Sequence, residues 1–152
     1  MKEWRKFGPI GVLFNVIASI STPQARQLLE QLQRNEADAI GIPADVRQLV
    51  RPVKTRWNSY FDTFMRATEL HSPIDSYIEL KLQEHNVATA LTRRRRNREQ
   101  LPEQQPRLFI REGGLTAKDW ATINEYIALL GLFAEATRLL KERGGRGCYS
   151  AI

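Results

Sequence analysis

Residues 115–120, Leu-Thr-Ala-Lys-Asp-Trp, open the segment of this chain whose local signals are clearest. Thr116 can accept a hydrogen bond from a free amide of a starting helix, and Asp119 three residues later can return one, as in a capping box. Leu115 and Trp120 flank the cap at the positions where two apolar side chains usually pack together. The pattern predicts a long helix that ends at Gly144-Gly145 and buries one stripe at three-four spacing. The stripe consists of Trp120, Ile123, Ile127, Leu130, Ala134 and Thr137.

Two further helical patterns occupy the N-terminal part. Pro9 suits a first helical turn, and the apolar residues after it spread over more than one side of the predicted helix. Thr22 and Pro23 form the start signal of a second helix, and its antiparallel packing on the first is expected because the turn between them is short. The apolar residues are Ile10, Val12, Leu13, Phe14, Val16, Ile17 and Ile20 in the first pattern, and Ala25, Leu28, Leu29 and Leu32 in the second. The polar residues of the second pattern are expected to face water; they are Arg26, Gln27, Glu30, Gln31, Gln33 and Arg34.

The periodicity is lost over residues 35–54, where a short helix at 44–50 or a short edge strand at 48–53 is the most that could form. A third helix is expected from residues 56–58. It should end before Ser72-Pro73, because the residue preceding a proline avoids the helical region. Ser72 would then cap a fourth helix, with Asp75 near its positive end. The less polar side of the third helix consists of Trp57, Tyr60, Phe61, Phe64 and Thr68, and that of the fourth helix consists of Ile74, Tyr77, Ile78 and Leu82.

Residues 84–114 have the composition of a linker, because they contain too few apolar residues to offset the entropy of ordering. The alternative for the first part of this stretch is a helical extension. The stretch carries four consecutive arginines, Arg93, Arg94, Arg95 and Arg96. This run could bind phosphates, serve as a nuclear import signal, or be only a solvated loop. The sequence therefore predicts an all-α fold of about five helices. Its parts are a helical region over 1–83, a flexible arginine-rich linker over 84–114, a long C-terminal helix over 115–143 and a disordered tail over 144–152.

The charge of the chain favours an anionic partner. Its 23 Lys and Arg against 17 Asp and Glu give a formal net charge of +6, which favours nucleic acid first and an acidic membrane surface second. The single Cys148 cannot form an intrachain disulfide, which fits a reducing compartment. No apolar run approaches the ~20 residues that span a bilayer, so no membrane insertion is expected.

The residue types that carry catalysis are scattered along the chain. Two-metal chemistry needs carboxylates that converge on paired ions, and the spacing of the aspartates gives no sign of this. His71 and His85 lie far apart with no further ligand at metal-binding spacing, and the glycines form no phosphate-binding loop. We therefore expect no enzymatic activity, no metal or other cofactor and no small-molecule substrate. The aspartates concerned are Asp38, Asp45, Asp62, Asp75 and Asp119.

Three stretches of the chain together resemble the hAT superfamily of DNA transposases, especially its fungal members. Their order and spacing are similar to those of the family, and the Thr-Arg-Trp-Asn-Ser run is the most specific part. One departure is Val53-Lys54, where relatives often carry an acidic residue or Asn just before this run. The stretches are 7–16 with 21–26, then 55–60 with 66–70 and 74–75, and finally 115–120 with 133–137.

The resemblance implies a segment that follows the second catalytic Asp of an RNase H-like core. In the family, the two Asp and one Glu that hold the metal ions lie upstream and downstream of the matched region, and neither part is present in this chain. The resemblance thus implies a truncated or degenerate hAT transposase segment, nuclear, with residual DNA binding and no strand transfer. The alternative is a helical protein-interaction module that associates with itself or with a full-length transposase.

The resemblance also indicates which residues would meet DNA. In relatives the Arg-Trp pair lies close to the transposon end, and the Trp stacks on a displaced base. By this resemblance Arg56 and Trp57 take the same role, and Asn58, Lys54 and the run from Arg93 to Arg96 are the further DNA-binding candidates. The alternative for Trp57 is that it fills the core beside Phe61.

Overall fold

The computed structural model describes residues 8–53, 56–95 and 114–144. These ranges contain five helices and no strand, which confirms the all-α prediction for the part of the chain described. The helices are α2 (Pro9–Ser19), α3 (Pro23–Ile40), α4 (Trp57–Glu69), α5 (His71–Arg95) and α6 (Ala117–Gly144).

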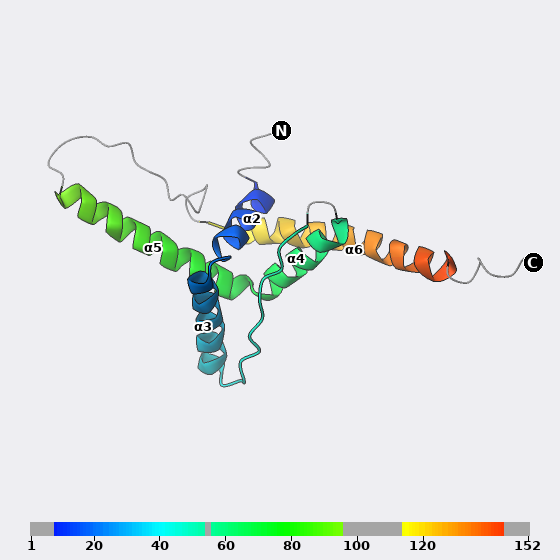
Figure 1. The fold of residues 1–152 in the computed structure, drawn as a ribbon, viewed down its shortest axis with the longest axis horizontal. Helices are drawn as coiled ribbons and strands as arrows, with labels where there is room; N and C mark the ends of the chain where they lie inside the picture. Colours follow the sequence, from blue (N-terminus) through cyan, green and yellow to red (C-terminus); the bar gives the residue numbers. More distant parts are fainter. Residues whose placement is uncertain (1–7, 54–55, 96–113, 145–152) are drawn as a thin grey trace, which may run out of the picture.

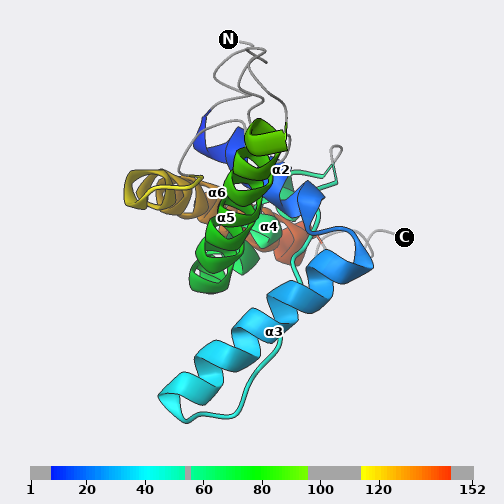
Figure 2. The ribbon, with the colours of Figure 1, turned by 90° about the vertical axis from the view of Figure 1, so that its left-hand side faces the viewer.

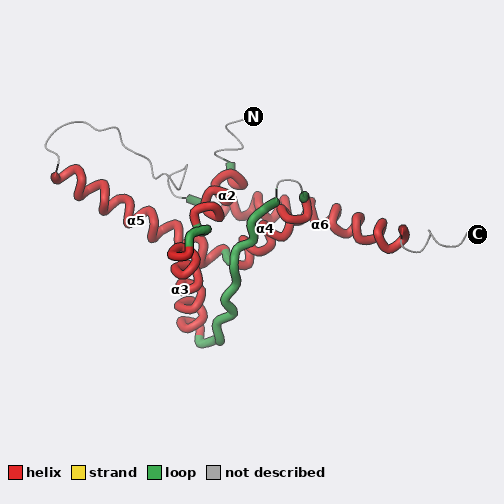
Figure 3. Tube along the Cα trace, in the orientation of Figure 1, coloured by secondary structure: helices red, strands yellow, loops and turns green. Residues whose placement is uncertain are grey.

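The helices are joined at a common centre and extend from it in different directions. α2, α4 and the first halves of α5 and α6 meet at this centre, and the second halves of α5 and α6 run outward on opposite sides (Figure 1). α3 leaves the centre in a third direction (Figure 2) and packs against α5, whereas α4 packs along α6. After α3 the chain returns beside it as a loop, residues 41–53 (Figure 3).

The core lies where the helices meet. α2 contributes two adjacent sides to it, as the spread of its apolar residues predicted, and Phe14 stacks on Phe64 of α4 with ring centroids 5.8 Å apart. Tyr77 and Ile123 are almost completely buried at the start of α5 and α6. The buried cluster consists of Val12, Leu13, Val16, Ile17, Ile20, Ala25, Leu29, Phe64, Ala67, Leu70, Ile74, Tyr77, Ile78, Leu115, Trp120 and Ile123.

The capping box predicted at the start of α6 is confirmed. The carboxylate of Asp119 accepts the backbone amide and the hydroxyl of Thr116, each at 2.7 Å, and the Thr116 hydroxyl oxygen accepts the Asp119 amide at 3.3 Å. Leu115 and Trp120, on either side of this cap, are both buried in the core cluster. The start of α6 is thus fixed both by local hydrogen bonds and by burial.

A buried tryptophan connects α6 to α5. The indole nitrogen of Trp120 donates to both carboxylate oxygens of Asp75, at 3.1 and 3.3 Å, and the His71 ring meets the indole edge-on at 6.0 Å between centroids. Burial raises the pKa of Asp75, while the Trp120 hydrogen bond and the charge of His71 oppose that rise. The expected place of Asp75 in the first turn is wrong; no acidic residue lies there, and Asp75 serves as the acceptor for this indole.

The chain enters α6 very close to α5. Gly114 has a positive φ of 62°, a conformation that residues with a Cβ rarely adopt. A Cβ at this position would overlap the Ile78 side chain. Glycine is therefore required here for two reasons, and its presence lets the start of α6 reach Asp75.

The corner between α4 and α5 lies earlier than the sequence predicted. α4 ends at Glu69 and α5 already begins at His71, with the Ile74 amide donating to the carbonyl of Leu70 at 3.0 Å. The cap assigned to Ser72 is therefore wrong, and Ser72 lies inside the first turn. Pro73 allows this because the first amides of a helix have no intrahelical acceptor, so a proline costs nothing there.

Two other expectations about the helices are corrected. α3 does not fold back on α2 as an antiparallel neighbour. It leaves the centre in its own direction and packs against α5 (Figure 2). The linker expected over 84–114 begins later, because the helical extension considered for its first part is present and α5 continues through residues 84–95. Its residues there include Leu, Ala, Glu and Arg, which favour helix without needing burial. Residues 96–113 and the expected tail from 145 onward lie outside the described residues.

A buried glutamine holds the loop of residues 41–53 against α3. Gln33 is only 7% exposed, although the sequence assigned it to the solvent side. Its amide group donates to the Arg47 carbonyl at 2.9 Å and accepts the Arg47 amide at 2.8 Å. These two bonds replace those of a helix or a strand, and neither of the elements considered for residues 44–53 forms.

We predict that Gln33→Ala destabilises the fold by about 1–2 kcal/mol, because two backbone groups of Arg47 lose their partners. Urea denaturation measures the loss, and exchange of the Arg47 amide should become faster. Gln31→Ala, an exposed substitution of the same type on the same helix, should change stability by less than about 0.5 kcal/mol. An unchanged Arg47 exchange rate in Gln33→Ala contradicts the proposed attachment.

We predict opposite effects for two substitutions of Asp75. Asp75→Ala removes the acceptor of a buried indole and should cost about 1–3 kcal/mol, whereas Asp75→Asn keeps an acceptor and removes the buried charge. Because the folded pKa of Asp75 is raised, its stabilising contribution is present below the unfolded pKa of about 3.9 and is lost as the pH rises through the folded pKa.

The free energy of unfolding of Asp75→Asn should therefore increase relative to that of the natural protein as the pH rises from 4 to 7. Denaturation at several pH values measures the difference. A difference that stays constant over this window argues against a buried charge at Asp75.

Candidate nucleic-acid interface

Three of the predicted DNA-binding residues lie together at the start of α4. Arg56 occupies the position before the first helical residue, with an extended backbone (φ −127°, ψ 103°), and Trp57 and Asn58 are the first two residues of the helix. All three are exposed to solvent. The indole of Trp57 is 38% exposed, which places it at the edge of the core and not within it.

The core begins one helical turn after Trp57. Tyr60 and Phe61 are half-buried, and the Phe61 ring lies over Gly131 of α6. Phe64, a further turn along, is buried and lies 6.5 Å from Tyr126 between ring centroids. The aromatic side of α4 was therefore predicted correctly from Tyr60 onward. Trp57, the first residue of the predicted side, lies at the margin of the core.

Ser59 fixes the chain that carries Arg56. Its hydroxyl oxygen accepts the Val53 amide at 2.8 Å, and its O–H group donates to the Arg56 carbonyl at 2.7 Å. The Arg56 amide donates to the Val53 carbonyl at 2.9 Å. The sequence did not single out Ser59. A serine in a first helical turn is a known signal for such bonds to nearby backbone.

The start of α4 is suited to receive an anion. The first amides of a helix point outward without intrahelical acceptors and lie at the positive end of the helix dipole. No acidic residue occupies the first turn, and no side chain caps it. Within the described ranges, the Arg56 guanidinium forms no ion pair with a carboxylate. Within the first turn of α4, no negative charge therefore opposes the binding of an anion.

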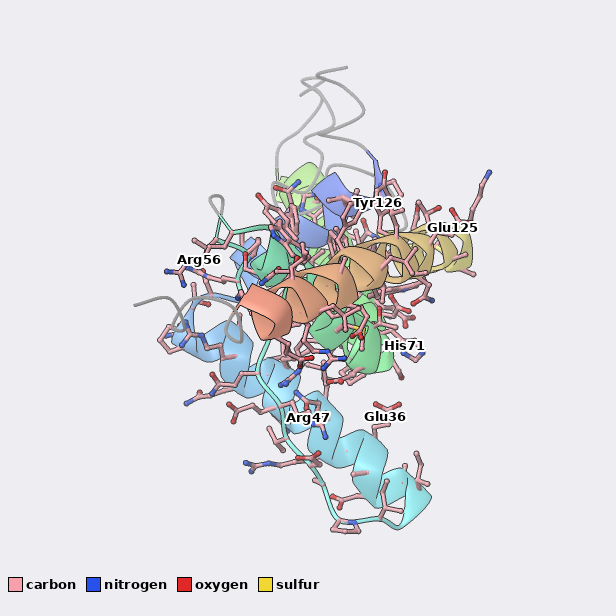
Figure 4. The ribbon with its side chains drawn as sticks, turned by 90° about the vertical axis from the view of Figure 1, so that its right-hand side faces the viewer. Glu36, Arg47, Arg56, His71, Glu125 and Tyr126 are labelled. Atoms are coloured by element: carbon pink, nitrogen blue, oxygen red, sulfur yellow. The ribbon has the colours of Figure 1, made fainter. Side chains whose placement is uncertain are left out.

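Other arginines of the same region differ because carboxylates neutralise them. Arg47 pairs with Asp45 at 2.6 Å and with Glu69 at 3.0 Å, and these hydrogen bonds raise its pKa above the usual value. Arg66 lies 3.1 Å from the same Glu69. Figure 4 shows Arg56 beside the start of α4 and Arg47 on the loop beside α3. Arg47 therefore stabilises the loop and is not free to bind phosphate.

A small cavity of about 130 Å³ lies between α2, α3 and the loop. Its walls combine apolar residues of the core margin with three arginines and one glutamate. The sequence did not predict this hollow, since it depends on the loop being held beside α3. It is lined by Ile17, Ile20, Ser21, Arg26, Leu29, Glu30, Arg47, Gln48, Leu49 and Arg51.

The structure does not bring the arginine run to this interface. Arg93, Arg94 and Arg95 are the last residues of α5, at the end that projects away from the start of α4 (Figure 1). Lys54 and Arg96 lie outside the described residues. The predicted set therefore divides into Arg56, Trp57 and Asn58 on one side and the end of α5 on the other.

The described part of the chain contains neither a cluster of metal ligands nor a membrane-spanning helix. No group of three or more His, Cys, Asp or Glu residues there could hold a metal ion. None of the helices α2–α6 is long and apolar enough to cross a membrane.

Comparison of the chain with protein-family models, with curated proteins and with solved structures finds no match. The resemblance to hAT transposases therefore rests on the three stretches of sequence alone.

Proposed function

We propose that this chain binds DNA weakly through the start of α4, as a truncated or degenerate hAT transposase segment that performs no strand transfer. The observation that supports it best is the exposed indole of Trp57 beside the exposed Arg56, whose guanidinium meets no carboxylate among the described residues. The net charge of +6 favours the same class of partner. The nucleus is the compartment in which such a segment would meet its DNA.

The chemistry of the interface is that of a stacking platform next to a phosphate site. An exposed indole can stack on an unpaired base for about 1–3 kcal/mol, whatever the base. The guanidinium of Arg56 and the free amides of α4 can hold the adjoining phosphate. Because an indole cannot reach a base face inside an intact duplex, single-stranded or branched DNA is the preferred ligand.

We predict that Trp57→Ala lowers affinity for a fluorescent single-stranded oligonucleotide by about 5- to 100-fold, the equivalent of one lost stacking contact. Trp57→Phe should keep much of the affinity because it keeps an aromatic face. Fluorescence anisotropy at low salt measures both. Equal affinity of the natural chain and Trp57→Ala would remove Trp57 from the interface.

Arg56→Ala should weaken binding because it removes one phosphate contact. The slope of log K against log salt concentration should become shallower by ~0.7, the value for one contact on a single strand. Arg34→Ala is the matched control, because Arg34 is also an exposed arginine but lies on α3. If the two variants lose affinity equally, binding depends only on net charge and not on the start of α4.

We predict that Asn58→Asp separates stability from binding. A carboxylate in the first turn of α4 interacts favourably with the helix dipole and should stabilise the protein by about 0.3–1 kcal/mol. The same charge repels phosphate, so DNA affinity should fall. Thermal denaturation and anisotropy on one preparation measure both effects. A variant that is more stable and binds DNA as well as before contradicts the proposed phosphate site.

A further inference from the structure

α6 is apolar on two separate sides. One side faces the core and carries the stripe that the sequence predicted, with Trp120 and Ile123 buried and Ile127 and Leu130 half-buried. The other side carries five large apolar residues that are 47–71% exposed. We call this second set, together with Ala136, the outer stripe of α6. It consists of Leu129, Leu132, Phe133, Ala136, Leu139 and Leu140.

The outer stripe has the spacing of a helix–helix contact. Its members recur at intervals of three and four residues, which keeps them on one side of the helix. A separate polar strip accompanies them, where Arg138 bonds Glu135 and Glu142 at 2.6 Å each. The helix is therefore amphipathic along its projecting half, with a clear division between the outer stripe and the charged residues.

No described part of the chain covers the outer stripe. The second half of α6 projects beyond the other helices (Figure 1), and its large apolar residues keep about half or more of their surface in water. An uncovered patch of this kind, on the order of several hundred Å², marks an interaction site in soluble proteins. A partner with an equally apolar helical surface would therefore be suited to cover the outer stripe.

The spacing of the outer stripe reads the same in both directions. Leu129, Leu132, Ala136 and Leu139 follow one another at intervals of three, four and three residues, and these intervals keep them on one side of α6. A surface with this spacing matches a reversed copy of itself.

We infer that two copies of this chain form a dimer through antiparallel packing of their outer stripes. With the two-fold axis at the level of residue 134, Leu129 lies opposite Leu139 of the second copy. Each Ala136 lies opposite a Leu132, so that a small residue faces a large one. Closed two-fold symmetry requires that one surface match itself, and this register meets that requirement along its whole length.

The expected dimer is weak. The two outer stripes together would cover roughly 1,000 Å², near the lower limit for a specific interface. Dissociation at micromolar concentrations is therefore expected. The inference does not depend on DNA binding, because it uses a surface of α6 that includes none of the proposed DNA contacts.

Sedimentation velocity of the full chain over a range of concentrations tests the inference. The natural protein should shift from monomer to dimer, and Leu132→Glu should remain monomeric at every concentration with unchanged helical circular dichroism. Val87→Glu is the matched control, because Val87 is 61% exposed on α5, and this variant should still dimerise. A natural chain that stays monomeric at hundreds of micromolar, as it would if another segment of the same chain covered the stripe, overturns the inference.

An exchange of side-chain size tests the antiparallel register. Ala136→Leu places two large residues opposite each other and should weaken dimerisation several-fold, and Leu132→Ala in the same chain should restore it. A double variant that is as weak as Ala136→Leu alone overturns this register. DNA binding provides the separate readout: Leu132→Glu should bind an oligonucleotide as before, and Trp57→Ala should still dimerise, so either proposal can fail alone.

Discussion

The hydrogen bond from the Trp120 indole to the Asp75 carboxylate is the constraint on which the arrangement of the two long helices depends. It joins the first turns of α6 to the first turns of α5, beside the close approach of Gly114 to Ile78. The two helices are therefore joined to each other near their N-terminal ends. Beyond the attachment, each helix is held by its own backbone hydrogen bonds and by side contacts, which for α6 come mainly from α4.

The features that were predictable from sequence are those encoded within a few residues. The cap of Thr116 and Asp119 is such a feature, because its donors and acceptors lie three residues apart. The first apolar helix was predictable for the same reason, since its spacing alone shows that more than one side is covered. The local pattern thus predicted that the elements are helices, and it also predicted how many helices the described residues form.

The features that were missed depend on contacts between distant residues. Gln33 was assigned to solvent because nothing near it in sequence indicates that Arg47, 14 residues later, brings its backbone groups to it. The outer stripe of α6 was missed because α6 carries apolar residues on two separate sides, and the sequence pattern was assigned only to the side that contains Trp120. Within the candidate site, the exposure of Arg56 and Trp57 fits the sequence-based hypothesis, whereas the arginine run was grouped with them only by charge. Sequence shows that residues are basic but not that a long helix carries them away from each other.

The attachment of α5 at one end gives its far end a mechanical property. From Ile78, the last residue of α5 in the buried cluster, to Arg95 the helix rises by roughly 25 Å at 1.5 Å per residue. A tilt of about 10° at the anchored end therefore corresponds to a displacement of roughly 4 Å at the far end. A small change of angle at the buried cluster is thus enlarged along α5 before it reaches Arg95.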